Sequence, residues 1–397
     1  MIDGRMKILN RVRLLSAALA AALVAASSNA AALADFPPYA HIVGIALVAP
    51  LSGDSREYGL QLSNGLQLAV DEANERRNLT DFGWVLHTFD DQNDPGVAQQ
   101  QAEFSLVDEG TSVVVGHVGA EETLLALPTY AQKGAPLIIP TSPLGQLTQR
   151  GYTDIFRLCP PDSAEGQQDA RYAERTLKAK KAAVIYQEND IGANTAQGFL
   201  NFANAGKNLA AKDFGVDPDV KSPAALVASI KTFAPDLLYA SGDGRFLSKT
   251  ILALRAAGVD APLFGTQGFW SDPAMKALGT GAQGTLVSSC VPPIELMPTA
   301  QLFIRHYQAR FGRPTSFALF GYVAGQVAIA AAQQVRTADR RLIARQLSIG
   351  SFQTILGTMT FQRNGDPAQP ILYLYRYGQD GAFKYVDATF PNPLIAR

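Results

Sequence analysis

The feature that most constrains the fold is a repeated alternation of short β-rich runs with longer amphipathic runs. The first unit begins with the apolar run 42–48, which predicts a buried strand. After a turn at residues 50–54, apolar residues recur at the spacing of one helix face: Leu62, Leu66, Ala69, Val70 and Ala73. Repeated units of this kind predict a parallel sheet covered by helices on both faces, with right-handed crossovers.

The alternation occurs in two series. The first predicts strands at 84–89, 112–116 and 136–140, with helices at about 97–107 and before Lys133. The second predicts strands at 181–186, 236–240 and 262–265, each followed by a helix, at about 191–205, 246–257 and 272–278. Two series in one chain predict an α/β protein with two doubly wound parallel-sheet lobes.

The last part of the chain departs from this pattern. Two long helices are expected at 299–311 and 317–334 without a strand between them. Strands are then expected at 352–361, 371–377 and 383–386, with turns at Asn364-Gly365 and Asp380-Gly381. Such a tail would add helices to the first lobe and closing strands to the second.

The chain would then pass between the lobes three times, near Leu158, Cys290 and Phe361. Lobe 1 would hold residues 35–158 and 291–361, and lobe 2 residues 159–290 and 362–397. Three passages form a hinge over a cleft, which allows a protein to close around a solute.

The N-terminus has the three parts of a secretory signal peptide. Lys7, Arg11 and Arg13 precede the apolar run 14–26, and small residues follow as far as Ala34. We expect residues 1–34 to be cleaved and the mature protein to be periplasmic. The alternative is an anchor that stays attached to the membrane.

Charge and cysteine content limit the partners and the covalent framework. Without residues 1–34 the chain keeps 30 basic and 34 acidic residues, so its net charge is near −4 and favours no nucleic acid partner. The two cysteines, Cys159 and Cys290, would lie in a compartment where disulfides persist. Their spacing leaves open both a disulfide and two separate buried thiols.

No arrangement typical of catalysis is present. The four histidines do not occur at metal-ligand spacing, and there is no G-x-S-x-G motif. Residues 279–284 match G-x-G-x-x-G, but a helix is expected before them and a strand after, the reverse of a dinucleotide site. The run 90–95 is interpreted as a strand-to-helix turn with Asp94 as the helix cap before Pro95. We therefore expect neither an enzyme nor a cofactor or metal.

Ordered motifs along almost the whole mature chain resemble one family. They are Leu51-Ser52-Gly53 with Tyr58-Gly59, Asp90-Asp91 with Asp94-Pro95, Val115-Gly116-His117, Leu147-Thr148 with Arg150-Gly151-Tyr152, and Phe156-Arg157. The chain resembles the leucine/isoleucine/valine-binding proteins, the type I periplasmic receptors that deliver solutes to ABC transporters. The resemblance implies a type I periplasmic binding fold, a small-molecule ligand between the lobes, a membrane permease as partner, and action as a monomer.

The resemblance implies ligand-binding positions in lobe 1. Tyr58 matches an aromatic residue of the family's cleft. Ala120 stands where the family has a serine that binds an amino acid carboxylate, with Glu121 and Glu122 beside it. The alternative for these two acids is that they face solvent at a helix start, where they suit the helix dipole.

A second lobe 1 position also departs from the family. Pro143 stands where a threonine usually binds the ligand, and proline offers neither a hydroxyl nor an N–H. Thr141 and Ser142 directly precede it and would supply substitute hydroxyls.

Lobe 2 departs in a similar way. Gln267 matches the glutamate that binds the ligand's ammonium in the family, while Asp243 and Ile191 match cleft tyrosines. Phe269 and Trp270 would either wall the cleft or pack in the core.

These departures weaken the recognition of a zwitterion, because an unpaired charge in a closed cleft is costly. We therefore expect a small polar amino-acid-like or amide-like solute, carried to an ABC importer by hinge closure, and not a standard branched-chain amino acid as the tightest ligand. The alternatives are a receptor that senses an amide, amine or aromatic acid and signals to a partner, and a secreted α/β enzyme.

Overall fold

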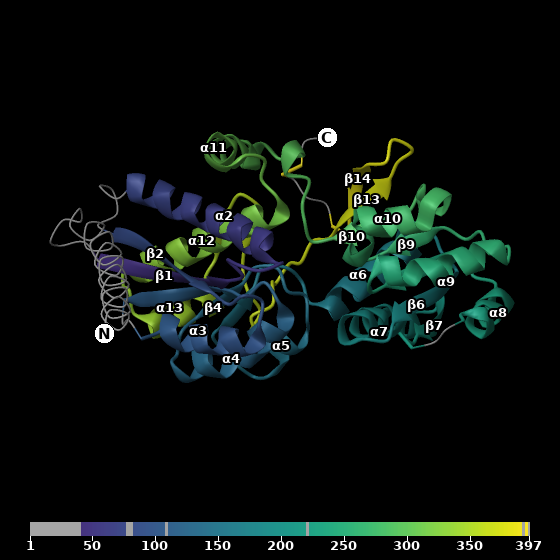
Figure 1. Cartoon of the computed structure of the whole chain (residues 1–397), viewed down its shortest axis with the longest axis horizontal. Helices are drawn as coiled ribbons and strands as arrows, with labels where there is room; N and C mark the ends of the chain where they lie inside the picture. Colours follow the sequence, from purple (N-terminus) through teal and green to yellow (C-terminus); the bar gives the residue numbers. More distant parts are fainter. Residues whose placement is uncertain (1–40, 77–81, 108–109, 220–221, 391–393, 396–397) are drawn as a thin grey trace, which may run out of the picture.

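The structure is a computed structural model that describes residues 41–76, 82–107, 110–219, 222–390 and 394–395. The expected signal peptide, residues 1–34, lies outside the described residues. Figure 1 shows two α/β bodies side by side along the long axis of the molecule, joined by extended segments. The fold class expected from the sequence is confirmed, with one doubly wound sheet in each body.

The first sheet has the strand order β2-β1-β3-β4-β5, and all its pairs are parallel. Its strands are β1 (His41–Ala49), β2 (Phe82–Asp90), β3 (Thr111–Gly116), β4 (Leu137–Ile139) and β5 (Ile155–Arg157). The helices between them are α2 (Arg56–Glu75), α3 (Pro95–Ser105), α4 (Ala120–Gln132) and α5 (Gln146–Gln149). Asp94 caps α3 as expected, since its Oδ1 accepts from the Val97 N–H at 2.9 Å.

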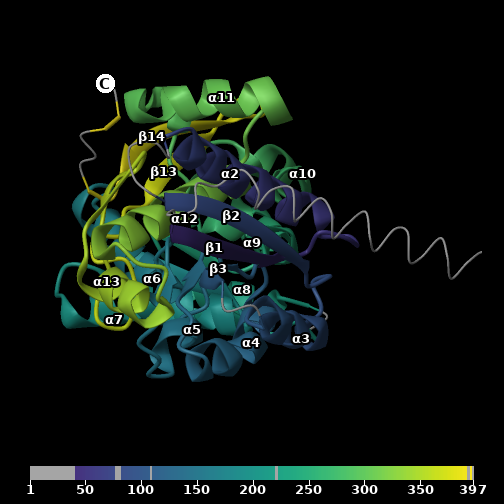
Figure 2. The same ribbon diagram turned by 90° about the vertical axis from the view of Figure 1, so that its left-hand side faces the viewer.

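Side chains of β1 alternate between two cores, one on each face of the sheet. Val43, Ile45 and Leu47 are fully buried in the core that contains α2 and α12 (Ser316–Val335). Ala46 and Val48 point the opposite way, into the core formed with α3 and α4. Figure 2 shows α2 above the strands of this sheet, with α3 and α4 below them. A strand buried on both faces explains the continuous apolar run in the sequence.

The second sheet has the order β14-β13-β10-β9-β8-β6-β7, in which β13 and β14 are antiparallel additions. Its strands are β6 (Lys181–Gln187), β7 (Ala210–Val216), β8 (Leu237–Ser241), β9 (Leu263–Gly265), β10 (Leu286–Ser289), β13 (Tyr373–Tyr377) and β14 (Phe383–Ala388). Helices α6 (Asp162–Arg175) and α7 (Asp190–Ala205) cover one face, and α8 (Ala224–Phe233), α9 (Gly244–Ala256) and α10 (Asp272–Leu278) the other. The G-x-G-x-x-G match lies between α10 and β10, mostly in a short 3₁₀ helix (Gly279–Ala282), so it is no dinucleotide site.

Several elements were not expected from the sequence. They are β5, α5, α6, β7, α8 and α13 (Arg340–Ile349). The expected strand 352–361 is instead a hairpin of β11 (Phe352–Thr354) and β12 (Gly357–Met359), because Gly357 adopts a φ of 96° and turns the chain back. The expected long helices are α11 (Gln301–Phe311) and α12.

Helix α12 is long and apolar enough by composition to cross a membrane. However, 67% of its most apolar stretch of 18 residues is buried inside the protein. Gly65 of α2 faces α12 so closely that a Cβ there would lie 1.9 Å from the carbonyl oxygen of Ala318. The helix is therefore a core element of the first body.

Cys159 and Cys290 form a disulfide, which resolves the alternatives left open by their spacing. Their Cα atoms are 5.7 Å apart, within the usual range for a bridge. Cys159 follows β5 of the first sheet, and Cys290 follows β10 of the second. The bridge thus joins two of the segments that connect the bodies.

The turn before β13 is attached to the first body. The backbone N–H of Arg157 donates to the carbonyl of Gly365 at 3.0 Å, and the Arg157 guanidinium pairs with Asp366 at 2.9 Å. The chain then continues through Leu372 into β13 of the second sheet.

Candidate ligand-binding cleft

A cavity of about 490 Å³ lies where the connecting segments meet both bodies. This volume is within the range of about 300–1,000 Å³ that small-molecule sites occupy. Its wall on the first body is formed by Thr141 and Pro143, in the loop after β4. Connecting segments and the second body supply the rest: Cys159, Pro160, Glu165, Gln187, Asn189, Ile191, Thr195, Gly242, Asp243, Thr266, Gln267, Gly268, Cys290 and Leu372.

The second-body wall is built from the carboxyl ends of parallel strands. β6, β8 and β9 all end at the cavity, and α7 and α9 begin there. Ligands of open α/β sheets bind at this edge, because strand ends and helix N-termini present free backbone groups. Asn189 caps α7 by accepting from the Gly192 N–H at 2.8 Å, and Asp243 caps α9 by accepting from the Phe246 N–H at 2.9 Å.

Two glycines allow the strand-end loops to touch. Gly242 has a φ of 117°, which only glycine adopts readily. A Cβ on Gly268 would lie 2.0 Å from the carbonyl oxygen of Gly242. The loops that carry Asp243 and Gln267 are therefore held together by backbone contact.

Side-chain hydrogen bonds fix two amides of this wall. The Oε1 atom of Gln187 accepts from the Asp243 N–H at 3.0 Å. The Oε1 atom of Gln267 accepts from the Ser289 hydroxyl at 3.2 Å. The Gln267 side chain is exposed, so its NH₂ group is available to a solute in the cavity.

A carboxyl pair lies on α6 at the base of the cavity. Glu165 lines the cavity, and Asp169, one turn further along, is fully buried. The Ser288 hydroxyl lies 3.2 Å from Glu165 Oε1 and 2.8 Å from Asp169 Oδ2, and the Tyr239 hydroxyl donates to Asp169 at 2.9 Å. Burial raises the pKa of Glu165 to about 7. Burial and the nearby Glu165 raise the pKa of Asp169 well above its usual value.

The cavity is acidic. Glu165 and Asp243 are its only lining residues with a formal charge, and no lysine, arginine or histidine lines it within the described part of the chain. The cavity therefore offers carboxylate oxygens and amides, and no counter-charge for an anion.

The wall on the first body offers hydroxyls without partners. Thr141 Oγ1 and Ser142 Oγ are buried, and neither has a hydrogen-bond partner among the described residues. Arg157, which is fully buried, holds the loop that follows them by donating to the carbonyls of Pro143 at 3.1 Å and Leu144 at 2.9 Å.

The structure brings together part of the predicted site. Thr141, Asp243 and Gln267 line the cavity, and Ser142 is buried next to Thr141 without lining it. Ile191, which matches a family tyrosine, also lines it. The role of these residues as ligand contacts stays a prediction.

Besides Ser142, three predicted residues lie outside the cavity lining. Tyr58 is half exposed at the start of α2 and stacks on Phe317, with 4.8 Å between ring centroids. Ala120 begins α4, and Glu121 beside it is exposed. Glu122 is 5% exposed, so only one of the two acids faces solvent.

The two aromatic candidates pack away from the cavity. Phe269 is fully buried in the core of the second body, as the alternative interpretation expected. Trp270 contacts Tyr375, with 4.2 Å between ring centroids.

Sequence reasoning missed Glu165, Gln187 and Asn189. Glu165 was missed because α6 was not expected. A local signal exists, since Pro160-Pro161 is followed by Asp162 and then Glu165, and acids in the first turn after proline are typical of a helix start.

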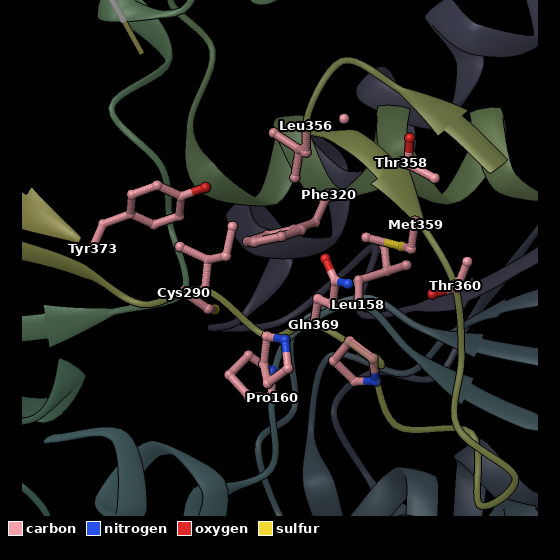
Figure 3. A pocket seen from close by; sticks show the side chains of 14 residues that line it. Leu158, Pro160, Cys290, Phe320, Leu356, Thr358, Met359, Thr360, Gln369 and Tyr373 are labelled. Carbon is pink, nitrogen blue, oxygen red and sulfur yellow. The ribbon is translucent and has the colours of Figure 1, made fainter. Parts of the chain in front are cut away.

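A second, smaller cavity of about 100 Å³ lies on the other side of the connecting segments. Figure 3 shows side chains of the connecting segments, of α12 and of the β11–β12 hairpin around it, among them Leu158, Cys290, Phe320 and Met359. Pro160 and Cys290 line both cavities, so the segment with the disulfide separates them. Its volume is well below that of typical ligand sites.

Comparison with known proteins agrees with this geometry. A family model described as periplasmic binding protein matches residues 42–382. The Leu/Ile/Val-binding protein BraC3 of Rhizobium johnstonii is 28% identical over 348 residues, covering 86% of this chain and 94% of that protein. A Leu/Ile/Val-binding protein homolog of Brucella melitensis is 28% identical over 371 residues, covering 92% of this chain and 97% of that protein.

A solved structure has the same fold. The crystal structure of a leucine binding protein from Thermotoga maritima has a TM-score of 0.70 at 22% identity, covering 88% of this chain and 99% of that chain. The resemblance read from the ordered motifs is thereby confirmed.

Proposed function

This chain belongs to the periplasmic binding protein family, and from that premise we propose that it is the solute-binding component of an ABC importer. The observation that carries the proposal is the cavity of about 490 Å³ at the strand ends of the second body, walled on the other side by Thr141 and Pro143 of the first. A site made by two bodies binds its solute most tightly when the bodies approach each other.

The proposed closing motion uses the connecting segments as a hinge. Lobe 1 would comprise residues 35–158 and 291–361, and lobe 2 residues 159–290 and 362–397. The separate sheets support this division, because β1 to β5 form one and β6 to β10 with β13 and β14 form the other. Closure would bring Tyr58, Ala120 and Glu121 of lobe 1 toward the solute held by lobe 2.

The solute would be small, polar and amino-acid-like or amide-like. Amides and carboxylates of Gln187, Gln267, Glu165 and Asp243 line or border the cavity and support this class. Relatives carry names for leucine, isoleucine and valine binding. We expect weaker binding of these amino acids here, because Ala120 has no hydroxyl for their carboxylate.

A thermal-shift screen with amino acids, amides, polyamines and aromatic acids tests the proposal. A ligand that binds only the folded protein stabilises it by mass action and so raises the unfolding temperature. At a free ligand concentration of 100 times Kd, the free energy of unfolding increases by about 2.7 kcal/mol. Small-angle scattering should then show a smaller radius of gyration with the ligand than without it. No stabilisation by any compound, or stabilisation without compaction, would argue against a closing receptor.

The protein would release its solute unchanged to a membrane permease. Relatives are named as binding proteins, which supports binding without turnover. Incubation of the protein with its ligand, followed by mass spectrometry, should recover the ligand intact. A product formed in proportion to protein and time would instead indicate an enzyme.

The protein would act as a monomer in the periplasm after cleavage of residues 1–34. Fractionation of cells should recover it in the periplasmic extract, with a mature N-terminus at Asp35. Recovery in the membrane fraction at full length would support the retained anchor.

A further inference from the structure

We propose that Glu165 is the group that binds a positively charged nitrogen of the solute. The inference rests on the proposed function and narrows it to solutes that carry an ammonium, amidinium or guanidinium group. It assigns a recognition role to α6, a helix that contributes one side chain to the cavity.

The charge balance of the cavity favours a cation. Its charged lining residues are Glu165 and Asp243, and no basic side chain accompanies them within the described residues. An anion brought into this cavity would meet two carboxyls and no counter-charge, whereas a cation would be attracted by both. Asp243 already accepts a hydrogen bond through Oδ1 as the cap of α9, so Glu165 is the more available of the two carboxylates for a solute cation.

The hydrogen bonds of Glu165 leave part of its accepting capacity unused. An ionised carboxylate accepts about four hydrogen bonds. Glu165 receives a backbone N–H from Gln267 and a hydroxyl from Ser288. Ser288 has a single hydrogen and lies closer to Asp169, at 2.8 Å against 3.2 Å. No cation pairs with Glu165 within the described part of the chain, so its carboxylate retains accepting capacity toward the cavity.

Asp169 explains how Glu165 can be ionised in a buried pair. Two carboxyls that share one hydroxyl do not both ionise readily, so one of them keeps a proton. Asp169 is the one fully buried, and its Oδ1 atom has no hydrogen-bond partner within the described residues. Asp169 therefore keeps its proton, and Glu165 is the carboxyl of the pair that ionises toward the cavity.

Other titratable groups near Glu165 do not neutralise it. Asp162 is on the same helix and adds negative charge, and Tyr239 faces the pair from β8 with its pKa raised by burial. Arg157 is a cation beyond Asp162, but it is paired with Asp366 at 2.9 Å. A solute cation would be the counter-charge that this region lacks.

The opposite wall offers a complementary contact. Thr141 Oγ1 is buried at the cavity without a hydrogen-bond partner within the described residues. A hydroxyl both donates and accepts, so it suits a polar group at the other end of the solute. Glu165 and Thr141 come from different bodies, and a solute that contacts both would favour closure.

Matched sets of compounds test the proposal. Each set contains an amino acid, its decarboxylated amine and its deaminated acid: leucine with 3-methylbutylamine and 4-methylpentanoate, phenylalanine with phenylethylamine and 3-phenylpropanoate, and arginine with agmatine and 5-guanidinopentanoate. Affinities are measured by isothermal titration for the wild type, Glu165→Gln and Glu174→Gln. Glu174 is on the same helix and does not line the cavity, so it controls for the substitution itself.

We expect compounds with a cationic nitrogen to bind the wild type and Glu174→Gln equally, and to bind Glu165→Gln at least tenfold more weakly. A tightest ligand without a cationic nitrogen, or a cationic ligand that binds Glu165→Gln within twofold of the wild type, would overturn the assignment and leave the receptor function intact. No binding of any compound from these sets or from the wider screen would contradict the receptor function itself.

Proton release gives a second readout that a merely structural role of Glu165 would not produce. Because burial raises the pKa of Glu165 to about 7, a cation that binds its carboxylate should expel a fraction of a proton near pH 7. Isothermal titrations in two buffers of different ionisation enthalpy measure the number of protons released on binding. The wild type should release protons and lose affinity as the pH falls below 7, whereas Glu165→Gln should do neither. Identical proton release by both proteins would contradict the proposal.

Discussion

Arg157 shapes the cavity without lining it. Its guanidinium is fully buried and is held by Asp366, while it donates to two carbonyls of the loop that follows Thr141. The sequence identified Phe156-Arg157 as a family motif but gave no reason for the arginine. The structure supplies that reason, because the side chain fixes a cleft loop and the turn before β13 at the same time.

Replacement of Arg157 by methionine should therefore lower both stability and ligand affinity. Removal of one partner from a buried ion pair costs about 3–5 kcal/mol, because Asp366 stays buried without its cation. Urea unfolding measures the loss, and thermal-shift titration measures the affinity. Arg150→Met is the control, since Arg150 is exposed. Equal stability of the two variants would contradict the positioning role.

At the residue scale, Asp169 makes the free energy of unfolding depend on pH. Its pKa in the folded protein is raised by burial and by Glu165, so the folded state holds a proton that the unfolded state releases near pH 4. This contribution is complete below about pH 4 and is lost as the pH rises toward the raised pKa of the folded state.

The unfolding temperature of the wild type should therefore fall between pH 5 and pH 8. Asp169→Asn keeps the neutral shape and should show a smaller fall, with a higher unfolding temperature than the wild type at pH 8. Calorimetry at the two pH values measures both, with Glu174→Gln as the unaffected control. A variant with the same pH slope as the wild type would show that Asp169 is ionised in the folded protein.

At the scale of elements, α2 and α12 pack through glycines. A Cβ on Gly321 would lie 2.1 Å from the carbonyl oxygen of Leu62, and one on Gly65 would lie 1.9 Å from that of Ala318. The helix backbones are thus in direct contact, which a side chain would prevent. This contact attaches the C-terminal helices to the first sheet across a sequence separation of more than two hundred residues.

Gly321→Ala should force these helices apart and cost about 1–3 kcal/mol, the usual effect of overpacking a core. Gly281→Ala is the control, because the nearest atom to its Cβ would be 3.8 Å away. Chemical unfolding of both variants measures the difference. A stabilising effect of Gly321→Ala would mean that the helix pair can adjust its spacing.

For the whole molecule, the disulfide between Cys159 and Cys290 restrains the hinge region. It closes a loop with a sequence separation of 131 residues and joins the segments after β5 and β10. A cross-link across such a loop reduces the entropy of the unfolded chain.

The double substitution Cys159→Ser and Cys290→Ser should lower the free energy of unfolding by about 2–5 kcal/mol. Wild-type protein treated with reductant should unfold like the variant, and the variant should not respond to reductant. Urea unfolding with and without reductant makes this comparison. Unchanged stability on reduction would indicate that the folded hinge is strained by the bridge.

The sequence determined the α/β class, the two series of strands, and most strands and helices that carry a continuous apolar run. Those elements can be predicted because burial leaves a pattern in the sequence. A strand buried on both faces has a continuous apolar run, and a helix buried on one face has apolar residues at regular spacing. Helices α6, α8 and α13 were not expected; α6 and α13 are polar on average, so few apolar residues mark their buried faces.

Tertiary structure decided which side chains share a cavity. Thr141, Asp243 and Gln267 were predicted from the family resemblance, and the sheets bring the strand ends that carry them to the cavity. Glu165 could not be found in this way, because its position depends on how α6 packs over β8 and β10. The bond between Cys159 and Cys290 depends likewise on the distance between two connecting segments, since chain spacing carries no information about Cα separation.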